Sequence, residues 1–231
     1  MPPRRIDHVI VLMLENRSFD HLFGFFRPDG GQTIDNLLEA DPNASNLLDP
    51  SKPEGADNPR FRASEPAPFA VHDTAGPAHS FNAVCVQLCN DESGPSAAHP
   101  AQNDGFVRSY KDSLLRHTHV VDKETLAEVM ASFSPAELPS INALARSFCL
   151  CDHWFCEVPG PTLPNRLYVH AATSQGWVHD DFRQSFTAKT IYELIEEAGL
   201  TWATYFHDFD DLYQFDRLAR TPEHFRRFED R

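Results

Sequence analysis

Two short polar segments contain the residue types in this sequence that are best suited to chemistry. The first is Glu15-Asn16, which directly follows an apolar run. A carboxylate beside a carboxamide offers hard oxygen atoms, the ligand type that divalent cations such as Mg²⁺ and Ca²⁺ prefer. A turn or a helix cap would use the same two residue types. Taken alone, that is the simpler interpretation of the pair.

The second segment places the hydroxyl of Thr162 among prolines and a glycine, in the run Pro-Gly-Pro-Thr-Leu-Pro-Asn-Arg of residues 159–166. Pro164 suits the first turn of a helix, and the free N–H groups at a helix start attract phosphate. A threonine hydroxyl is a poor nucleophile unless a base or a metal lowers its pKa. Thr162 is therefore either a nucleophile beside a cation or, more simply, a helix cap.

Both segments follow stretches that the apolar pattern predicts to be strands. Residues 6–14 form a nearly continuous apolar, β-branched run, which is typical of a strand buried on both faces of a parallel sheet. Residues 148–155 predict a second strand and residues 201–206 a third. In open α/β sheets, ligands bind beyond the carboxyl ends of the strands, where both polar segments would lie.

Helical patterns alternate with these strands and favour an α/β sheet with helices on its faces. Ser18 and Gly24 are suited to begin and end a short helix, and Thr190 with Glu193 has the spacing of a capping box. Proline, asparagine and aspartate are frequent from about residue 29 to 78, which predicts a loop-rich excursion. Further helices are expected at residues 80–88, 105–115, 125–133, 139–146, 167–172 and 191–198.

Composition excludes several classes of protein. The 231 residues carry 34 acidic and 20 basic side chains, a net charge of −14 that disfavours binding to nucleic acid. We expect no transmembrane segment, because no stretch approaches the roughly 20 apolar residues that span a bilayer. The start of the sequence does not have the pattern of a signal peptide, which predicts a cytoplasmic protein.

Several longer stretches, taken in order, closely resemble the signature of a bacterial phosphoesterase family. The first is ENRSFDHLFG at residues 15–24, and the longest is DHWFCEVPGPTLPNRL at residues 152–167, continued by HAATS at 170–174. The shorter matches are Pro77-x-His79-Ser80, Asn103-Asp104-Gly105-Phe106, Leu138-Pro139, Thr190-Ile191-Tyr192 and Glu197-Ala198-Gly199-x-x-Trp202. The family contains non-haemolytic phospholipases C and acid phosphatases, some of them secreted or periplasmic.

The resemblance implies an alkaline-phosphatase-like fold and hydrolysis of phosphate esters, including phospholipids. Glu15, Asn16 and Thr162 would bind one divalent metal ion, and Thr162 would also be the nucleophile that forms a phosphothreonine intermediate. His79 would donate a hydrogen bond to phosphate or, equally, fix its own loop. Asn165 and Arg166 would hold the loop at the substrate, and Arg166 could also reach the phosphate.

The chain departs from the family toward its C-terminus. Family members normally supply adjacent aspartates and a further histidine near an Asp-x-x-Gly-Gly stretch, which does not occur here. The pair Asp210-Asp211 matches an earlier part of the pattern. We therefore expect residues 1–231 to be the N-terminal portion of one domain, incomplete at its C-terminus and inactive alone. The alternative is a truncated, non-catalytic relative that binds phosphate-bearing ligands or a protein partner.

Overall fold

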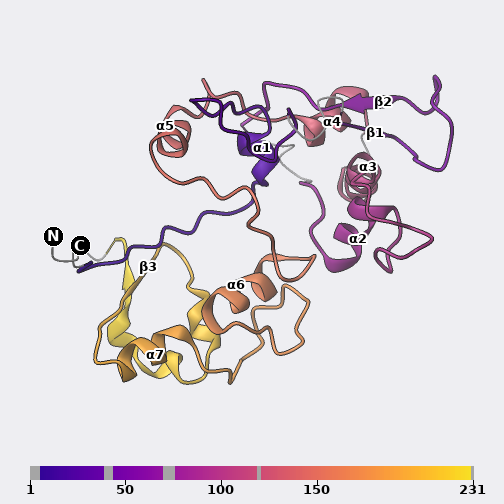
Figure 1. Ribbon diagram of the computed structural model, residues 1–231. Helices are drawn as coiled ribbons and strands as arrows, with labels where there is room; N and C mark the ends of the chain where they lie inside the picture. The colour runs from indigo at the N-terminus through magenta and orange to yellow at the C-terminus, as the bar shows by residue number, and fades with distance from the viewer. Residues whose placement is uncertain (1–5, 39–43, 70–75, 119–120, 230–231) are drawn as a thin grey trace. The chain divides into compact units, whose positions relative to one another are not determined.

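The computed structural model describes residues 6–38, 44–69, 76–118 and 121–229 (Figure 1). These residues belong to two compact units, each considered by itself. Unit 1 comprises residues 1–44, 63–68 and 131–152, and unit 2 comprises residues 45–62, 69–130 and 153–231. Parts of the predicted excursion, at residues 39–43 and 70–75, lie outside the described residues.

Unit 1 is organised around a short helix, α1 (Phe19–Phe23), and a second helix, α5 (Pro139–Ser147). Ser18 caps α1 as the sequence predicts, because its hydroxyl accepts a hydrogen bond of 3.1 Å from the backbone N–H of His21. The buried amide of Asn36 donates to the carbonyl of Phe23, the last residue of α1, and to the carbonyl of Phe26. These bonds tie the segment around Asn36 to the end of the helix.

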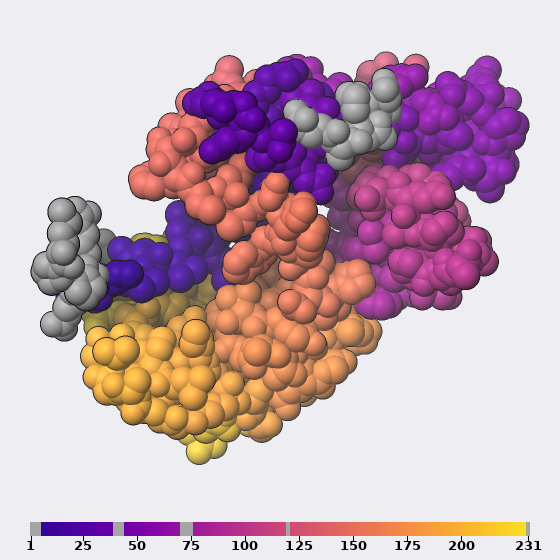
Figure 2. Space-filling view, viewed as in Figure 1, coloured from indigo at the N-terminus to yellow at the C-terminus, as the bar shows by residue number. Residues whose placement is uncertain are grey.

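The two long apolar stretches predicted to be buried strands do not form strands. Residues 6–14 have no regular structure, and Ile10 and Val9 expose 91% and 81% of their surface; this segment is part of the indigo surface in Figure 2. Residues 148–155 likewise lack a strand, and Trp154 is 82% exposed. A strand requires hydrogen-bonded neighbours, and the described residues supply none for either segment. Both strand predictions are wrong for this structure.

The first half of unit 2 packs helices against a small hairpin. The antiparallel strands β1 (Ser45–Leu47) and β2 (Arg60–Arg62) lie within the region that the sequence predicts to be loop-rich. The helices are α2 (Phe81–Cys89), α3 (Phe106–His117), α4 (Lys123–Ala127) and the 3₁₀ turn η1 (Glu128–Met130). Their shared core consists of Phe61, Val107, Tyr110, Leu114 and Leu126.

The second half of unit 2 has its own core beneath helix α6 (Thr162–Ala171) and helix α7 (Ile191–Glu197). Strands β3 (Thr204–Phe206) and β4 (Phe225–Arg227) pair in parallel, so the third predicted strand is confirmed over three residues. Three 3₁₀ turns complete the region, η2 (Asp211–Gln214), η3 (Leu218–Arg220) and η4 (Pro222–His224). The core residues are Leu163, Leu167, Phe186, Leu212, Phe215 and Leu218.

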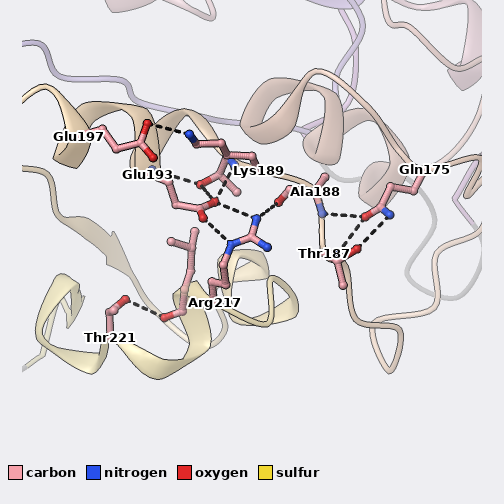
Figure 3. Close-up of polar contacts among 10 residues, drawn as sticks. Gln175, Thr187, Ala188, Lys189, Glu193, Glu197, Arg217 and Thr221 are labelled. Atoms are coloured by element: carbon pink, nitrogen blue, oxygen red, sulfur yellow. Dashed lines mark hydrogen bonds and ion pairs between the residues drawn. The ribbon is translucent and has the colours of Figure 1, made fainter.

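The start of α7 is fixed by the predicted capping box and by an arginine from the segment before η3. Thr190 and Glu193 exchange the two hydrogen bonds of the box. Arg217 binds the Glu193 carboxylate and donates a 3.0 Å hydrogen bond to the Ala188 carbonyl, as Figure 3 shows. A local sequence signal and a distant side chain therefore hold the same helix end.

The described residues form a mixed α/β structure with seven α-helices and two sheets of two strands each. The predicted helices are present with two differences. Helix α6 begins five residues earlier than expected, at Thr162 rather than Leu167. The helix predicted at 125–133 is the short α4 followed by η1, which ends at Met130. No extended sheet with helices on both faces occurs among the described residues. The reason is that the two strands expected to lie at its centre have no partners here.

Candidate functional site

Thr162 is the first residue of α6 and is half-buried. The N-cap position is occupied by Pro161, which has no side chain able to cap. The interpretation of Thr162 as the helix cap is therefore wrong. In the described part of the chain, the Thr162 hydroxyl has no recorded hydrogen-bond partner, which leaves it available for chemistry at the start of the helix.

Asn165 holds the loop that leads to Thr162. Its side-chain nitrogen donates to the carbonyls of Val158, at 2.9 Å, and Pro161, at 3.0 Å. Its side-chain oxygen accepts from the Val158 N–H at 3.0 Å. Asn165 therefore clamps the proline-rich turn, which explains why an asparagine suits this position. Its predicted contact with substrate remains a prediction.

His79 lies near the start of α6, although more than 80 residues separate it from Thr162 in the sequence. The link is Asp180, whose Oδ1 accepts a 3.0 Å hydrogen bond from the Leu163 N–H. Its Oδ2 lies 3.9 Å from His79 Nε2. Gly160 packs beside the first residue of α2, since a methyl group there would lie 3.7 Å from the Phe81 Cα. The imidazole is mostly exposed, so it can meet a ligand from solvent.

Sequence reasoning assigned no role to Asp180. A carboxylate at a helix N-terminus is stabilised by the helix dipole and by the free N–H groups there. It also neutralises part of the positive potential that would otherwise attract an anion to α6. No spacing pattern links Asp180 to Thr162, and the hydrogen bond joins residues 17 positions apart.

Arg166 takes part in a polar network that joins α6 to η2 and α7. Its Nη1 lies 3.2 Å from Asp211 Oδ1, and His170 Nε2 lies 3.3 Å from Asp211 Oδ2. His170 Nδ1 is 3.1 Å from the Tyr192 hydroxyl on α7. Asp211 and His170 are 7% and 6% exposed. Both carboxylate oxygens and both imidazole nitrogens therefore have partners, as buried polar groups require.

The two adjacent aspartates have pKa values shifted in opposite directions. Burial pushes the pKa of Asp211 upward, but the hydrogen bond and charge of His170, together with Arg166, outweigh it and hold the pKa below 3.8. Burial, helped by the Asp211 charge, raises the pKa of Asp210. Burial and the charges of both aspartates raise the pKa of Tyr192 to about 12. The environment of Asp211 thus favours its charged form, whereas burial of Asp210 penalises its charged form.

Glu15 and Asn16 belong to unit 1, whereas Thr162, His79, Asn165 and Arg166 belong to unit 2. Glu15 is exposed, and Asn16 has a left-handed φ of 69°, which places the pair in a turn ahead of α1. Ser18 is the residue that caps α1, so neither Glu15 nor Asn16 does. The structure gathers the four unit 2 residues around the start of α6.

The chemistry of the predicted metal ligands suits a hard divalent cation, because a carboxylate, a carboxamide and a hydroxyl all bind through oxygen. Only the carboxylate of these three groups is anionic, which limits the affinity for the cation. Within the described ranges, no group of three or more histidine, cysteine, aspartate or glutamate side chains could hold a metal ion. Nor does any helix of these residues have the length and apolar character needed to cross a membrane.

A mixed α/β structure in which a proline-framed threonine opens a helix beside a histidine and an arginine is suited to phosphate chemistry. The sequence profile of the Phosphoesterase family matches residues 6–230. The chain therefore belongs to the phosphoesterase family.

Two plant relatives and one bacterial relative show the extent of the similarity. The chain is 32% identical to non-specific phospholipase C3 of Arabidopsis thaliana, over 93% of this chain and 39% of the relative. It is 33% identical to non-specific phospholipase C1 of the same plant, over 93% of this chain and 37% of the relative. Identity to phospholipase C A of Mycobacterium tuberculosis is 29%, over 87% of this chain and 37% of the relative. The chain thus spans well under half the length of these relatives.

Proposed function

We propose that this chain is part of a metal-dependent hydrolase of phosphate esters, of the phospholipase C type, that acts through a phosphothreonine intermediate. One observation carries the proposal above the others. Within a chain of the phosphoesterase family, Thr162 occupies the first position of α6 with its hydroxyl uncommitted. A capping threonine would instead occupy the N-cap position, one residue before the helix, and its hydroxyl oxygen would accept a hydrogen bond from a backbone N–H of the first turn.

In the proposed reaction, the Thr162 oxygen attacks phosphorus in line with the leaving alcohol. The hydroxyl proton passes to water, the P–O bond to the leaving group breaks, the leaving oxygen takes up a proton from water, and a phosphothreonine forms. Water then attacks phosphorus and releases inorganic phosphate or a phosphomonoester, which restores the threonine. A cation held by Glu15, Asn16 and Thr162 would stabilise the alkoxide and polarise the phosphoryl oxygens.

The other side chains near α6 would bind and orient the phosphoryl group. His79 is exposed, and its Nε2 lies 3.9 Å from Asp180, the carboxylate that accepts from the Leu163 N–H; from there it would donate a hydrogen bond to phosphate. Arg166 supplies a planar set of donors suited to two phosphate oxygens. Asn165 keeps the turn rigid, so the Thr162 oxygen is held in one position.

The substrate is a phosphodiester such as a phospholipid or, as for the acid phosphatases that the sequence also resembles, a phosphomonoester. The relatives named phospholipase C support the first of these. A protein that contains only residues 1–231 would be inactive, because Glu15 would be the single anionic ligand of the cation. A non-catalytic module that binds phosphate-bearing ligands or a protein partner is the competing function.

The test is a metal-supplemented assay with a diester and a monoester of p-nitrophenol. It compares the full translation product of the gene with the 231-residue chain. We expect turnover by the full product and none by the isolated chain. Thr162→Ala should reduce turnover by about 10³-fold or more, whereas the exposed Thr187→Ala should leave it unchanged.

Two results would contradict the proposal. Turnover that survives Thr162→Ala would exclude Thr162 as the nucleophile. Absence of turnover in the full product, with phosphate binding intact, would favour the non-catalytic alternative. Mass spectrometry of the quenched reaction should detect one added phosphoryl group on the peptide that contains Thr162.

A further inference from the structure

Arg166 starts from the same face of α6 as Thr162. Residues four apart on a helix lie on the same face, and long side chains point back toward the helix N-terminus. Arg166 follows Thr162 by four positions. The side chains of Thr162 and Arg166 therefore start one turn apart on the same face of α6.

Asp211, the first residue of η2, contacts both Arg166 and the next residue on that face of α6, His170. One of its oxygens accepts from Arg166 Nη1, and the other is held by His170 Nε2. The Tyr192 phenol, whose pKa is raised to about 12, stays protonated and lies 3.1 Å from His170 Nδ1, so the other ring nitrogen, Nε2, faces Asp211. Three elements, α6, α7 and η2, thus determine the orientation of one carboxylate.

We propose that Asp211 is a positioning residue, supported by His170, that orients Arg166 to bind a phosphoryl group at Thr162. The inference rests on the proposed function of Thr162. In this arrangement Asp211 touches neither substrate nor metal. It holds one edge of the guanidinium group so that the planar donor set has one orientation when phosphate arrives.

Stability alone is a poor reason for this network. Burying an ion pair costs desolvation energy, and replacing such a pair with apolar residues of similar volume is often neutral or stabilising. The apolar cluster of Leu163, Leu167 and Leu212 surrounds the same helix and would accept such a replacement. An arginine held by a buried, fully hydrogen-bonded aspartate is instead the usual means of orienting a binding group.

The adjacent aspartate provides a matched control. Asp210 is also buried, at 5% exposure, but its oxygens accept hydrogen bonds from the Leu212 N–H and the Thr204 hydroxyl rather than from Arg166 or His170. Burial raises its pKa and so penalises its charged form. Asp210→Asn therefore removes a neighbouring buried carboxylate but not the one that contacts Arg166.

The experiment titrates the ¹⁵N-labelled 231-residue chain with inorganic phosphate and follows the Arg166 Nε–H and Leu163 amide signals by NMR. In the wild-type chain both signals should shift saturably. Asp211→Asn should weaken the apparent affinity for phosphate by about 10- to 100-fold, the usual cost of losing such a supporting partner. Asp210→Asn should bind as the wild type does. The amide spectrum of each variant shows whether it is folded.

The outcomes separate the inference from the proposed function. If phosphate shifts neither signal in the wild type, the phosphate site at α6, and with it the proposed function, fails. If phosphate binds but Asp211→Asn has wild-type affinity, the positioning role is overturned and the proposed function stands. Should Asp211→Asn not fold, Arg166→Lys decides, because it keeps the charge but not the planar donors. Wild-type affinity in Arg166→Lys would also overturn the inference.

Discussion

The sequence predicts a buried strand at residues 6–14 of unit 1 and a helix in the α6 region of unit 2, but only the second contributes to a core in the structure. Ile10 is 91% exposed in the first segment, whereas Leu163 is fully buried in the second. Both segments are rich in apolar residues. The difference lies in where each finds its hydrogen-bond partners.

A helix satisfies its backbone within its own segment, so α6 needs only packing partners, and these lie within about 60 residues of it. A strand obtains every backbone partner from another strand. The pattern of residues 6–14 therefore indicates a strand whose neighbours must come from elsewhere. An apolar pattern therefore indicates that a segment can be buried. Whether a strand is buried depends on a neighbouring strand that pairs with its backbone.

The largest effect should come from breaking the α6 core. Leu167→Ala removes a side chain that is 1% exposed and leaves a cavity, which should lower the free energy of unfolding by about 2–5 kcal/mol. The matched substitution in unit 1, Ile10→Ala, should change it by less than about 0.5 kcal/mol. Urea unfolding followed by tryptophan fluorescence measures both. Equal losses would mean that residues 6–14 are packed in solution.

A smaller effect, dependent on pH, should follow from Asp211→Asn. The pKa of Asp211 is lower in the folded protein than its usual 3.8, so its ionised form stabilises the fold at neutral pH. That contribution is lost as pH falls from about 4 through the folded-state pKa. We expect Asp211→Asn to cost about 2 kcal/mol at pH 7 and less at pH 3, measured by unfolding at each pH. A cost that does not vary with pH would contradict the assigned charge.

The smallest effect should come from the helix cap of α7. Thr190→Ala removes the hydroxyl that accepts from the Glu193 N–H and should cost about 1 kcal/mol. Thr190→Ser keeps the hydroxyl and should restore most of the loss. Thermal unfolding of the three proteins provides the comparison. An alanine variant as stable as the wild type would show that Arg217 alone fixes this helix end.

Local signals in the sequence predicted the parts of the fold that depend on neighbouring residues. Ser18 and the pair Thr190 and Glu193 cap the helices that the sequence assigns to them. The start of α6 was predicted too late, because a run containing three prolines indicates a loop although proline is compatible with a first helical turn.

The candidate site was predictable in part. The resemblance to the phosphoesterase family singled out His79, Thr162, Asn165 and Arg166, which the structure gathers around α6. Two contacts were missed, because Asp211 lies 45 positions from Arg166 and Asp180 lies 17 from Leu163. No periodicity connects such pairs, so only a three-dimensional structure could identify them.

The most direct test of the account is whether Glu15, Asn16 and Thr162 share one cation. Mn²⁺ added to the ¹⁵N-labelled chain broadens the amide signals of residues near its binding site. The account predicts that the amides of Asn16 and Leu163 lose intensity in parallel, at the same Mn²⁺ concentrations, and that excess Mg²⁺ restores both. Loss at one of these positions while the other keeps full intensity would contradict it.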